Sequence, residues 1–165
     1  MSIKIVTDSA CDVPTELAAA LDITIIPVYV NIGQESYQDG VDISRQEFYK
    51  NLYSYPTPPT TAAPAAGSFT EAYERLAAAG ATEILSLHIA ANLSNTFNAA
   101  RLGAEAAENA SVTLFDTQQV SMGGGLLVLL AAEAAANGKS MAEILQMLEA
   151  RVPKTRIFGM LDTLE

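Results

Sequence analysis

Short apolar runs separated by polar turns divide the chain into alternating strands and helices. Most of these runs are almost continuously apolar, which predicts strands covered on both faces, as in a parallel sheet with crossover helices. The predicted strands are residues 3–7, 23–30, 83–89, 111–116 and 155–161. Helical spacing between them gives the order β, α, β, α, α, β, α, β, α, α, β. This order predicts an α/β fold with a doubly wound, mostly parallel sheet sandwiched by helices.

Serine followed three residues later by glutamate marks several predicted helix starts. In such a capping box, the two side chains bind backbone N–H groups that the first helical turn leaves without partners. Pro14 marks an earlier helix start, because its fixed φ suits the first turn. The boxes are Ser44 with Glu47, Ser68 with Glu71, and Ser140 with Glu143. We interpret them as structural signals and not as sites.

A proline-rich stretch, residues 55–67, lies between the first two boxes. Proline has no backbone N–H and a fixed φ, so this stretch forms neither a helix interior nor a central strand. Connections of this length in a compact domain are usually functional loops or flexible linkers. The elements on either side are too few to make two separate sheets. We therefore predict a functional loop folded over the sheet.

Residues 83–100 place a strand, a short turn and a helix in direct succession. Ligands of open α/β sheets collect beyond the carboxyl ends of the strands, where helix N-termini present free N–H groups. Ser94 and Thr96 lie at this junction, which predicts a site for a small anionic group. Thr61 is expected on the same rim, so that Thr61 and Ser94 together hold one carboxylate. The alternative for Ser94 is a plain helix cap, and the residues alone leave the two open.

Charge and composition narrow the range of partners. The chain has 165 residues, enough for one domain with a core. Its formal net charge of −10 disfavours nucleic acid and anionic membrane surfaces, because phosphates are repelled. The single cysteine, Cys11, excludes an internal disulfide and a CxxC metal site, and we interpret it as a packing residue. The acidic charge suits a cytoplasmic protein, which we predict. The longest apolar run, residues 125–132, is too short to span a bilayer, so we predict no membrane span.

His88 is the only histidine, so any histidine-based catalysis uses it. A Ser-His-Asp arrangement of Ser94, His88 and either Asp8 or Asp116 gives an alternative function, an esterase or thioesterase. The GxSxG motif of many such enzymes is missing from the sequence, however. A histidine packed at the end of a strand is therefore the favoured interpretation, and we predict no catalytic residue.

Two further patterns carry weaker signals. Residues 121–125 are rich in glycine, as phosphate-binding loops are, but the lysine of a P-loop is missing. We interpret them as a tight turn with close packing of helix on sheet. Aspartates without a metal-ligand spacing are interpreted as turn residues: Asp8, Asp39, Asp42 and Asp116. We predict no metal and no cofactor.

Several short motifs, spread in order over the whole chain, resemble the DegV family of bacterial fatty-acid-binding proteins. They are Thr7-Asp8-Ser9 with Asp12-Val13-Pro14, Tyr37 with Asp39-Gly40, Thr60-Thr61 with Pro64, Leu93-Ser94 with Thr96, Asp116-Thr117 with Ser121, Gly123 and Gly125, and Asp162-Thr163-Leu164-Glu165. The resemblance covers the amino-terminal part of that family. It implies an amino-terminal α/β domain at residues 1–161, and at residues 162–165 the start of a linker to a second domain absent from this chain.

The resemblance also implies a function. Members of the family enclose a long-chain fatty acid between two domains, and in some relatives a separate kinase phosphorylates its carboxylate for phospholipid synthesis. Such a protein is a carrier and not an enzyme. Thr61 matches the threonine of the family's TSQP-like motif and Ser94 the serine of its LSGT-like motif. Both contact the carboxylate in the family, so we predict the same here, with a fatty acid kinase as partner.

Some positions near these motifs depart from the family's pattern. Ala62 and Ala63 stand where the family has serine and glutamine, Ala90 and Ala91 where it has two serines, and Asn95 where it has glycine. The alanines remove polar groups from around the carboxylate. Asparagine accepts left-handed backbone better than most residues, so Asn95 is compatible with a left-handed or a helical position.

Apolar residues at predicted strand ends and helix starts form a candidate tunnel wall for the acyl chain: Ile26, Ile89, Leu93 and Phe97. Each methylene buried there contributes about 0.8 kcal/mol. A third interpretation is an interaction domain, since a first domain alone exposes the apolar surface on which a second one packs.

Overall fold

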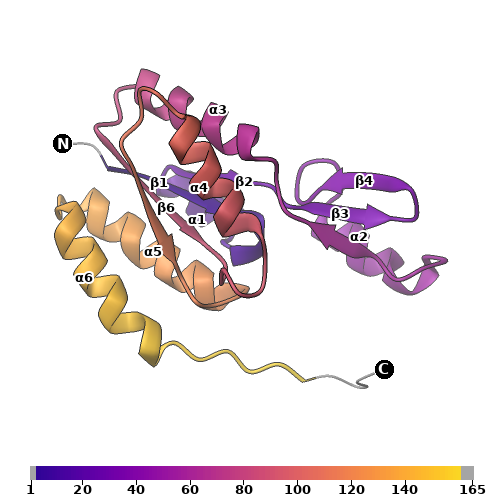
Figure 1. Ribbon diagram of the computed structural model, residues 1–165. Coiled ribbons are helices and arrows are strands. Elements are labelled where there is room, and N and C mark those ends of the chain that lie inside the picture. The colour runs from indigo at the N-terminus through magenta and orange to yellow at the C-terminus, as the bar shows by residue number, and fades with distance from the viewer. Residues whose placement is uncertain (1–2, 161–165) are drawn as a thin grey trace.

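The computed structural model describes residues 3–160 and has a parallel sheet with helices on both faces (Figure 1). Its strands are β1 (Ile3–Asp8), β2 (Ile23–Ile26), β6 (Glu83–His88) and β7 (Val112–Asp116), in the order β2-β1-β6-β7. β1 connects to β2 through α1 (Thr15–Ala20), and β6 connects to β7 through α4 (Thr96–Ala106). The direction of winding reverses between β1 and β6, as in doubly wound folds. The predicted α/β class and parallel sheet are confirmed.

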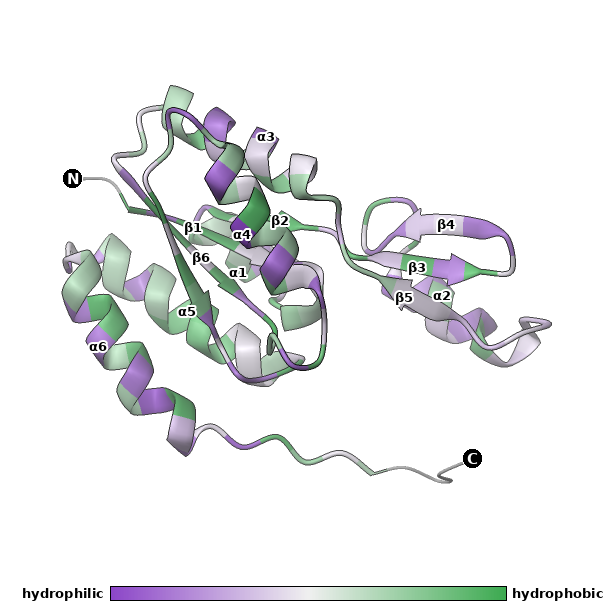
Figure 2. Cartoon of the chain, in the orientation of Figure 1, coloured by the Kyte–Doolittle hydropathy of each residue, from purple (hydrophilic) through white to green (hydrophobic). Residues whose placement is uncertain are grey.

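Alternate residues of the central strands supply two cores, one on each face of the sheet. Leu85 and Leu87 of β6 share a core with α5 (Met122–Ala136) and α6 (Met141–Arg151). Figure 2 shows apolar residues along most of the length of α5, as expected for a helix that lies between the sheet and α6. Ile84 of β6 belongs to the other core, under α3 (Ala66–Ala78) and α4.

A second, antiparallel sheet projects from this sandwich between β2 and α3 (Figure 1). It contains β3 (Tyr29–Ile32), β4 (Glu35–Gln38) and β5 (Thr60–Ala62), in the order β4-β3-β5. The helix α2 (Arg45–Asn51) and the short 3-10 helix η2 (Leu52–Ser54) belong to the same excursion of the chain. We call residues 28–63 the inserted lobe. This sheet was not predicted from the sequence. One of its strands, β5, lies inside the proline-rich stretch.

The single strand predicted for residues 23–30 is wrong. Pro27 follows the last residue of β2, the edge strand beside β1, and because it has no N–H to donate to a strand ladder it favours an end to the pairing there. The chain then enters the antiparallel sheet at Tyr29. Val28, between the two sheets, is fixed by its N–H, which donates to Ser9 Oγ at 3.0 Å.

The strand predicted for residues 155–161 is also wrong over the residues that the structure describes. Residues 155–160 follow the 3-10 helix η3 (Val152–Lys154) as an irregular, mostly exposed segment without strand pairing. Ile157 of this segment lies against the first turn of α5, beside Gly123. Residue 161 and the predicted linker at 162–165 lie outside the described residues.

The predicted capping boxes mark two helix starts out of three. Ser44 precedes α2 and its hydroxyl accepts the Glu47 N–H at 3.1 Å. Ser140 precedes α6 and forms both halves of the box with Glu143. The box at Ser68 is wrong, because Ser68 lies inside α3, whose N-cap is Ala65.

Replacing Ser140 with alanine removes the acceptor of the Glu143 N–H, and we expect the free energy of unfolding to fall by about 1 kcal/mol. Urea denaturation followed by circular dichroism measures this loss. Ser68→Ala is the matched control, since serine is the poorer helix former inside α3 and its replacement should leave stability equal or slightly higher. Equal losses at the two positions would contradict the capping role of Ser140.

Candidate functional site

One pocket of the protein lies at the point where the winding of the parallel sheet reverses. It has a volume of about 510 Å³ and is lined by Ala10, Val28, Thr61, Ala62, Ala63, Ile89, Leu93, Ser94, Asn95 and Val120. Ala10 follows β1 and residues 89–95 follow β6, the two strands between which the direction of winding changes. Ligands of doubly wound sheets bind in this crevice, beyond the carboxyl ends of the strands. We call it the switch-point pocket.

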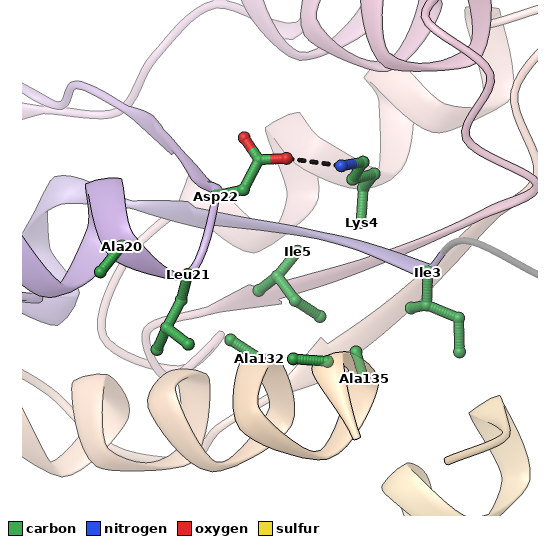
Figure 3. A pocket seen from close by; sticks show the side chains of 9 residues that line it. Ile3, Lys4, Ile5, Ala20, Leu21, Asp22, Ala132 and Ala135 are labelled. Carbon is green, nitrogen blue, oxygen red and sulfur yellow. Dashed lines mark hydrogen bonds and ion pairs between the residues drawn. The ribbon is translucent and has the colours of Figure 1, made fainter. Parts of the chain in front are cut away.

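A second hollow, of about 380 Å³, lies at the opposite end of the sheet (Figure 3). Its walls come from the start of β1, the turn before β2 and the last turns of α5. Lys4 and Asp22 form an ion pair of 2.5 Å beside it, so the lysine charge is already matched by a carboxylate. Because this hollow lies at the amino ends of the strands, away from the usual ligand crevice, we do not assign it as the site.

The switch-point pocket brings together Thr61 and Ser94, the two predicted carboxylate donors. Thr61 lies in β5, opposite Val30 of β3, and therefore belongs to the inserted lobe. Ser94 lies in the turn before α4, on the side of the main sheet. The pocket therefore lies between the inserted lobe and the main sheet, and each of the two supplies one hydroxyl.

The structure places two of the four residues of the predicted tunnel wall in the switch-point pocket. Ile89 and Leu93 line the switch-point pocket, and Leu93 is 65% exposed. Ile26 is buried in the core under α3, because the last residue of β2 faces that helix. Phe97 lies on α4 and is not among the described lining residues.

Val28 and Val120 line the pocket and were missed by the sequence analysis. Val28 stands between the two sheets, just after the proline that ends β2. Val120 precedes α5 and is 39% exposed. A valine in a polar turn is a signal that could have indicated a binding wall, since it leaves an apolar side chain in water.

The turn that carries Ser94 is held by its own backbone. The N–H groups of Leu93 and Ser94 donate to Ala90 O at 2.9 and 3.2 Å. Asn95 has φ −74° and ψ 0°, so it needs no left-handed conformation and the glycine of the family motif is not required by the backbone. Asn95 is the N-cap of α4, and the Ser94 hydroxyl accepts the next N–H, that of Thr96, at 3.2 Å. Ser94 therefore assists the helix start without being the N-cap itself.

His88 is engaged in a buried network that does not include Ser94. Its Nε2 lies 2.7 Å from Ser86 Oγ and its Nδ1 lies 2.9 Å from Asp8 Oδ2. The Ser86 hydroxyl also bonds to Tyr73 Oη at 2.8 Å, and burial raises the pKa of Tyr73 to about 12. All four side chains are fully buried. Because both ring nitrogens of His88 have other partners, the Ser94 and His88 pair of the hydrolase alternative is not formed.

The buried network holds two lining residues of the switch-point pocket in place. Asp8 Oδ2 accepts the Ile89 N–H at 3.2 Å, and Asp8 Oδ1 accepts the Ala10 N–H at 3.1 Å. The Thr117 hydroxyl donates to His88 O at 2.7 Å. Ala10 and Ile89 are lining residues, so this one carboxylate sets the position of two parts of the wall.

The described residues that line the pocket include no charged side chain. Within residues 3–160, no group of histidine, cysteine, aspartate and glutamate side chains is arranged to hold a metal ion. Asp42 accepts the Gln38 N–H at 2.8 Å and Asp116 accepts the Gln118 N–H at 2.9 Å, which are turn roles. In the same range, no helix combines the length and the apolar character needed to cross a membrane.

Comparison with known proteins gives a consistent picture. A sequence model of the family described as "Uncharacterised protein, DegV family" matches residues 2–165. A DegV domain-containing protein of Deinococcus radiodurans is 41% identical over 165 residues, which is 100% of this chain and 58% of that protein. The chain therefore spans little more than half the length of this relative.

Solved structures share the fold. A DegV family protein from Thermus thermophilus, described by its fatty acid binding, superposes with a TM-score of 0.84 at 36% identity, over 93% of this chain and 54% of that one. DegV from Bacillus subtilis, described as a fatty acid binding protein, superposes with a TM-score of 0.87 at 29% identity, over the same shares of 93% and 54%.

Proposed function

This chain belongs to the DegV family, and on that premise we propose that it carries a long-chain fatty acid in the switch-point pocket. In this proposal the hydroxyls of Thr61 and Ser94 donate to the carboxylate, and the acyl chain lies along Ile89, Leu93 and the other apolar lining residues. The observation that carries it is the meeting of two hydroxyls, from the inserted lobe and from the turn before α4, in one largely apolar pocket.

The apolar wall supports a lipid ligand. Leu93 and Val120 are 65% and 39% exposed, which leaves apolar surface in water beside the two hydroxyls. Covering such surface with an acyl chain is favourable by about 25 cal/mol per Å² of apolar area. The hydroxyls are neutral donors, which hold a carboxylate reversibly and do no chemistry on it.

We further propose that the protein is a carrier in the cytoplasm, and that a fatty acid kinase acts on the carboxylate it presents. Residues 1–161 are then the first of two domains, and the second completes the enclosure of the ligand. The place of His88 supports a carrier over the esterase or thioesterase alternative, because its ring nitrogens bond to Asp8 and Ser86, which leaves Ser94 without this general base.

Replacing Ser94 with alanine is expected to weaken the binding of palmitate by about 10- to 100-fold, since a hydrogen bond to a charged group contributes about 1.5–3 kcal/mol. Thr61→Val, which keeps the side-chain shape and removes the hydroxyl, is expected to act in the same direction. Displacement of a fluorescent fatty acid measures both. Ser111→Ala, at an exposed position before β7, is the control and should bind as the unaltered protein does.

Two results would overturn the proposal. One is unchanged palmitate affinity in both Ser94→Ala and Thr61→Val. The other is turnover of a chromogenic acyl ester that disappears in Ser94→Ala and in His88→Ala alike, which would support the hydrolase. Mass spectrometry of a denatured extract adds an independent readout, since a carrier is expected to purify with fatty acid bound.

A further inference from the structure

The Ser94 hydroxyl makes two hydrogen bonds with the same residue, Thr96. The Thr96 backbone N–H donates to Ser94 Oγ at 3.2 Å, and Thr96 Oγ1 lies 2.9 Å from Ser94 Oγ. A serine oxygen has two lone pairs and one O–H. The two contacts therefore use either both lone pairs of Ser94, or one lone pair and its proton.

Burial decides between these two arrangements. Thr96 is fully buried, and among residues 3–160 its hydroxyl hydrogen bonds to the Ser94 hydroxyl alone. If Ser94 donated to Thr96, the Thr96 proton would be buried without an acceptor, which is unfavourable. Ser94 is half-buried and lines the pocket, so its own proton can reach a ligand or water. The favoured arrangement has Thr96 donating and Ser94 accepting twice.

We propose that Thr96 is a positioning residue that holds the Ser94 hydroxyl as a donor aimed at the switch-point pocket. With both lone pairs of Ser94 in use, its hydroxyl offers a ligand only its O–H. Such a group selects a head group that accepts hydrogen bonds and carries no proton, such as a carboxylate, over a donor such as an ammonium. This inference rests on the proposed function and names the cause of its head-group selectivity.

Thr96→Val tests the role of the threonine, because valine keeps the buried β-branched shape and lacks the O–H. One lone pair of Ser94 becomes free and its hydroxyl can turn to accept. We expect palmitate to bind about 3- to 10-fold more weakly and hexadecylammonium to bind more tightly, so that the ratio of the two affinities falls by about 10-fold or more. The net charge of −10 is the same in both proteins and does not change the ratio. Thr96→Ser retains the hydroxyl and should keep the original ratio.

The outcomes separate this inference from the proposed function. If Ser94→Ala and Thr61→Val both leave palmitate affinity unchanged, the proposed site itself is wrong. If Ser94→Ala weakens binding while Thr96→Val keeps the acid-to-amine ratio, the positioning role of Thr96 is wrong and the proposed function stands. A merely structural effect would lower both affinities together and leave the ratio unchanged. Should Thr96→Val fail to fold, Thr96→Cys, whose thiol is a weak donor, is held to the same expectation.

Discussion

Replacing Gly125 with alanine is expected to lower the free energy of unfolding by about 3 kcal/mol, because the added methyl group has no space. A Cβ at Gly125 would lie 2.4 Å from the Cys11 carbonyl oxygen. That oxygen belongs to the 3-10 helix η1 (Ser9–Cys11), which Asp8 holds by accepting the Ala10 N–H. Relief would require moving α5 away from the sheet on which it packs. Urea denaturation followed by circular dichroism measures the loss.

Gly123 supplies the matched control on the same helix. A Cβ at Gly123 would meet the terminal Cδ1 of Ile157 at 2.9 Å, and this flexible side chain can turn away. Alanine is also the better helix former, so Gly123→Ala should change stability by less than about 1 kcal/mol. Gly124→Ala should have an intermediate effect on stability, because the added Cβ would lie 3.0 Å from Cys11 Sγ. A loss at Gly123 as large as the loss at Gly125 would contradict the part assigned to the Cys11 carbonyl.

Replacing Asp8 with asparagine is expected to lower the free energy of unfolding by about 3 kcal/mol, through the buried network of His88. The two Asp8 oxygens accept from His88 Nδ1, from the Ile89 N–H and from the Ala10 N–H. The amide of asparagine presents an NH₂ group in place of one oxygen, so a donor would face a donor in the core. Thermal or urea denaturation checks the loss.

Asp22→Asn is the control for Asp8→Asn, since Asp22 is also an aspartate that bonds to a basic side chain, and it lies just before β2. Its side chain is 77% exposed, and exposed ion pairs such as Asp22 with Lys4 contribute only about 0–1 kcal/mol. Asn also suits the positive φ of 53° at this position. If Asp8→Asn and Asp22→Asn lowered the free energy of unfolding by the same small amount, the buried Asp8 network would contribute little to stability and this prediction would be wrong.

The parallel sheet was predictable because its strands are buried on both faces and appear as continuous apolar runs. The inserted lobe was not, because its strands are short and two of them, β4 and β5, lack such runs. β4 reads Glu-Ser-Tyr-Gln and β5 reads Thr-Thr-Ala, and neither sequence has the pattern of a buried strand. β3 continues the apolar run of β2, so only the proline between them marks the change of sheet.

The two hydroxyls of the site could be predicted from the sequence, but the hydrogen bonds that hold the site in place could not. Ser94 was indicated by a strand followed by a helix, and Thr61 by the loop and the family motif. The bond between Asp8 and His88 depends on which strands are neighbours, and the two residues are 80 positions apart. The hydrogen bond between Ser94 and Thr96 is local, but its direction follows from burial, which the sequence does not report.

The adjacency of β1 and β6 also sets an order of events during synthesis of the chain. β1 emerges from the ribosome long before its neighbour β6, since Asp8 of β1 and His88 of β6 are 80 positions apart. Pairing of such distant segments closes a long loop, which slows folding. The turn that carries Ser94 follows β6 directly, so the two halves of the switch-point pocket meet only after the whole of the inserted lobe and α3 have been made. Any ligand of this pocket therefore binds late, once the central pair of strands has closed.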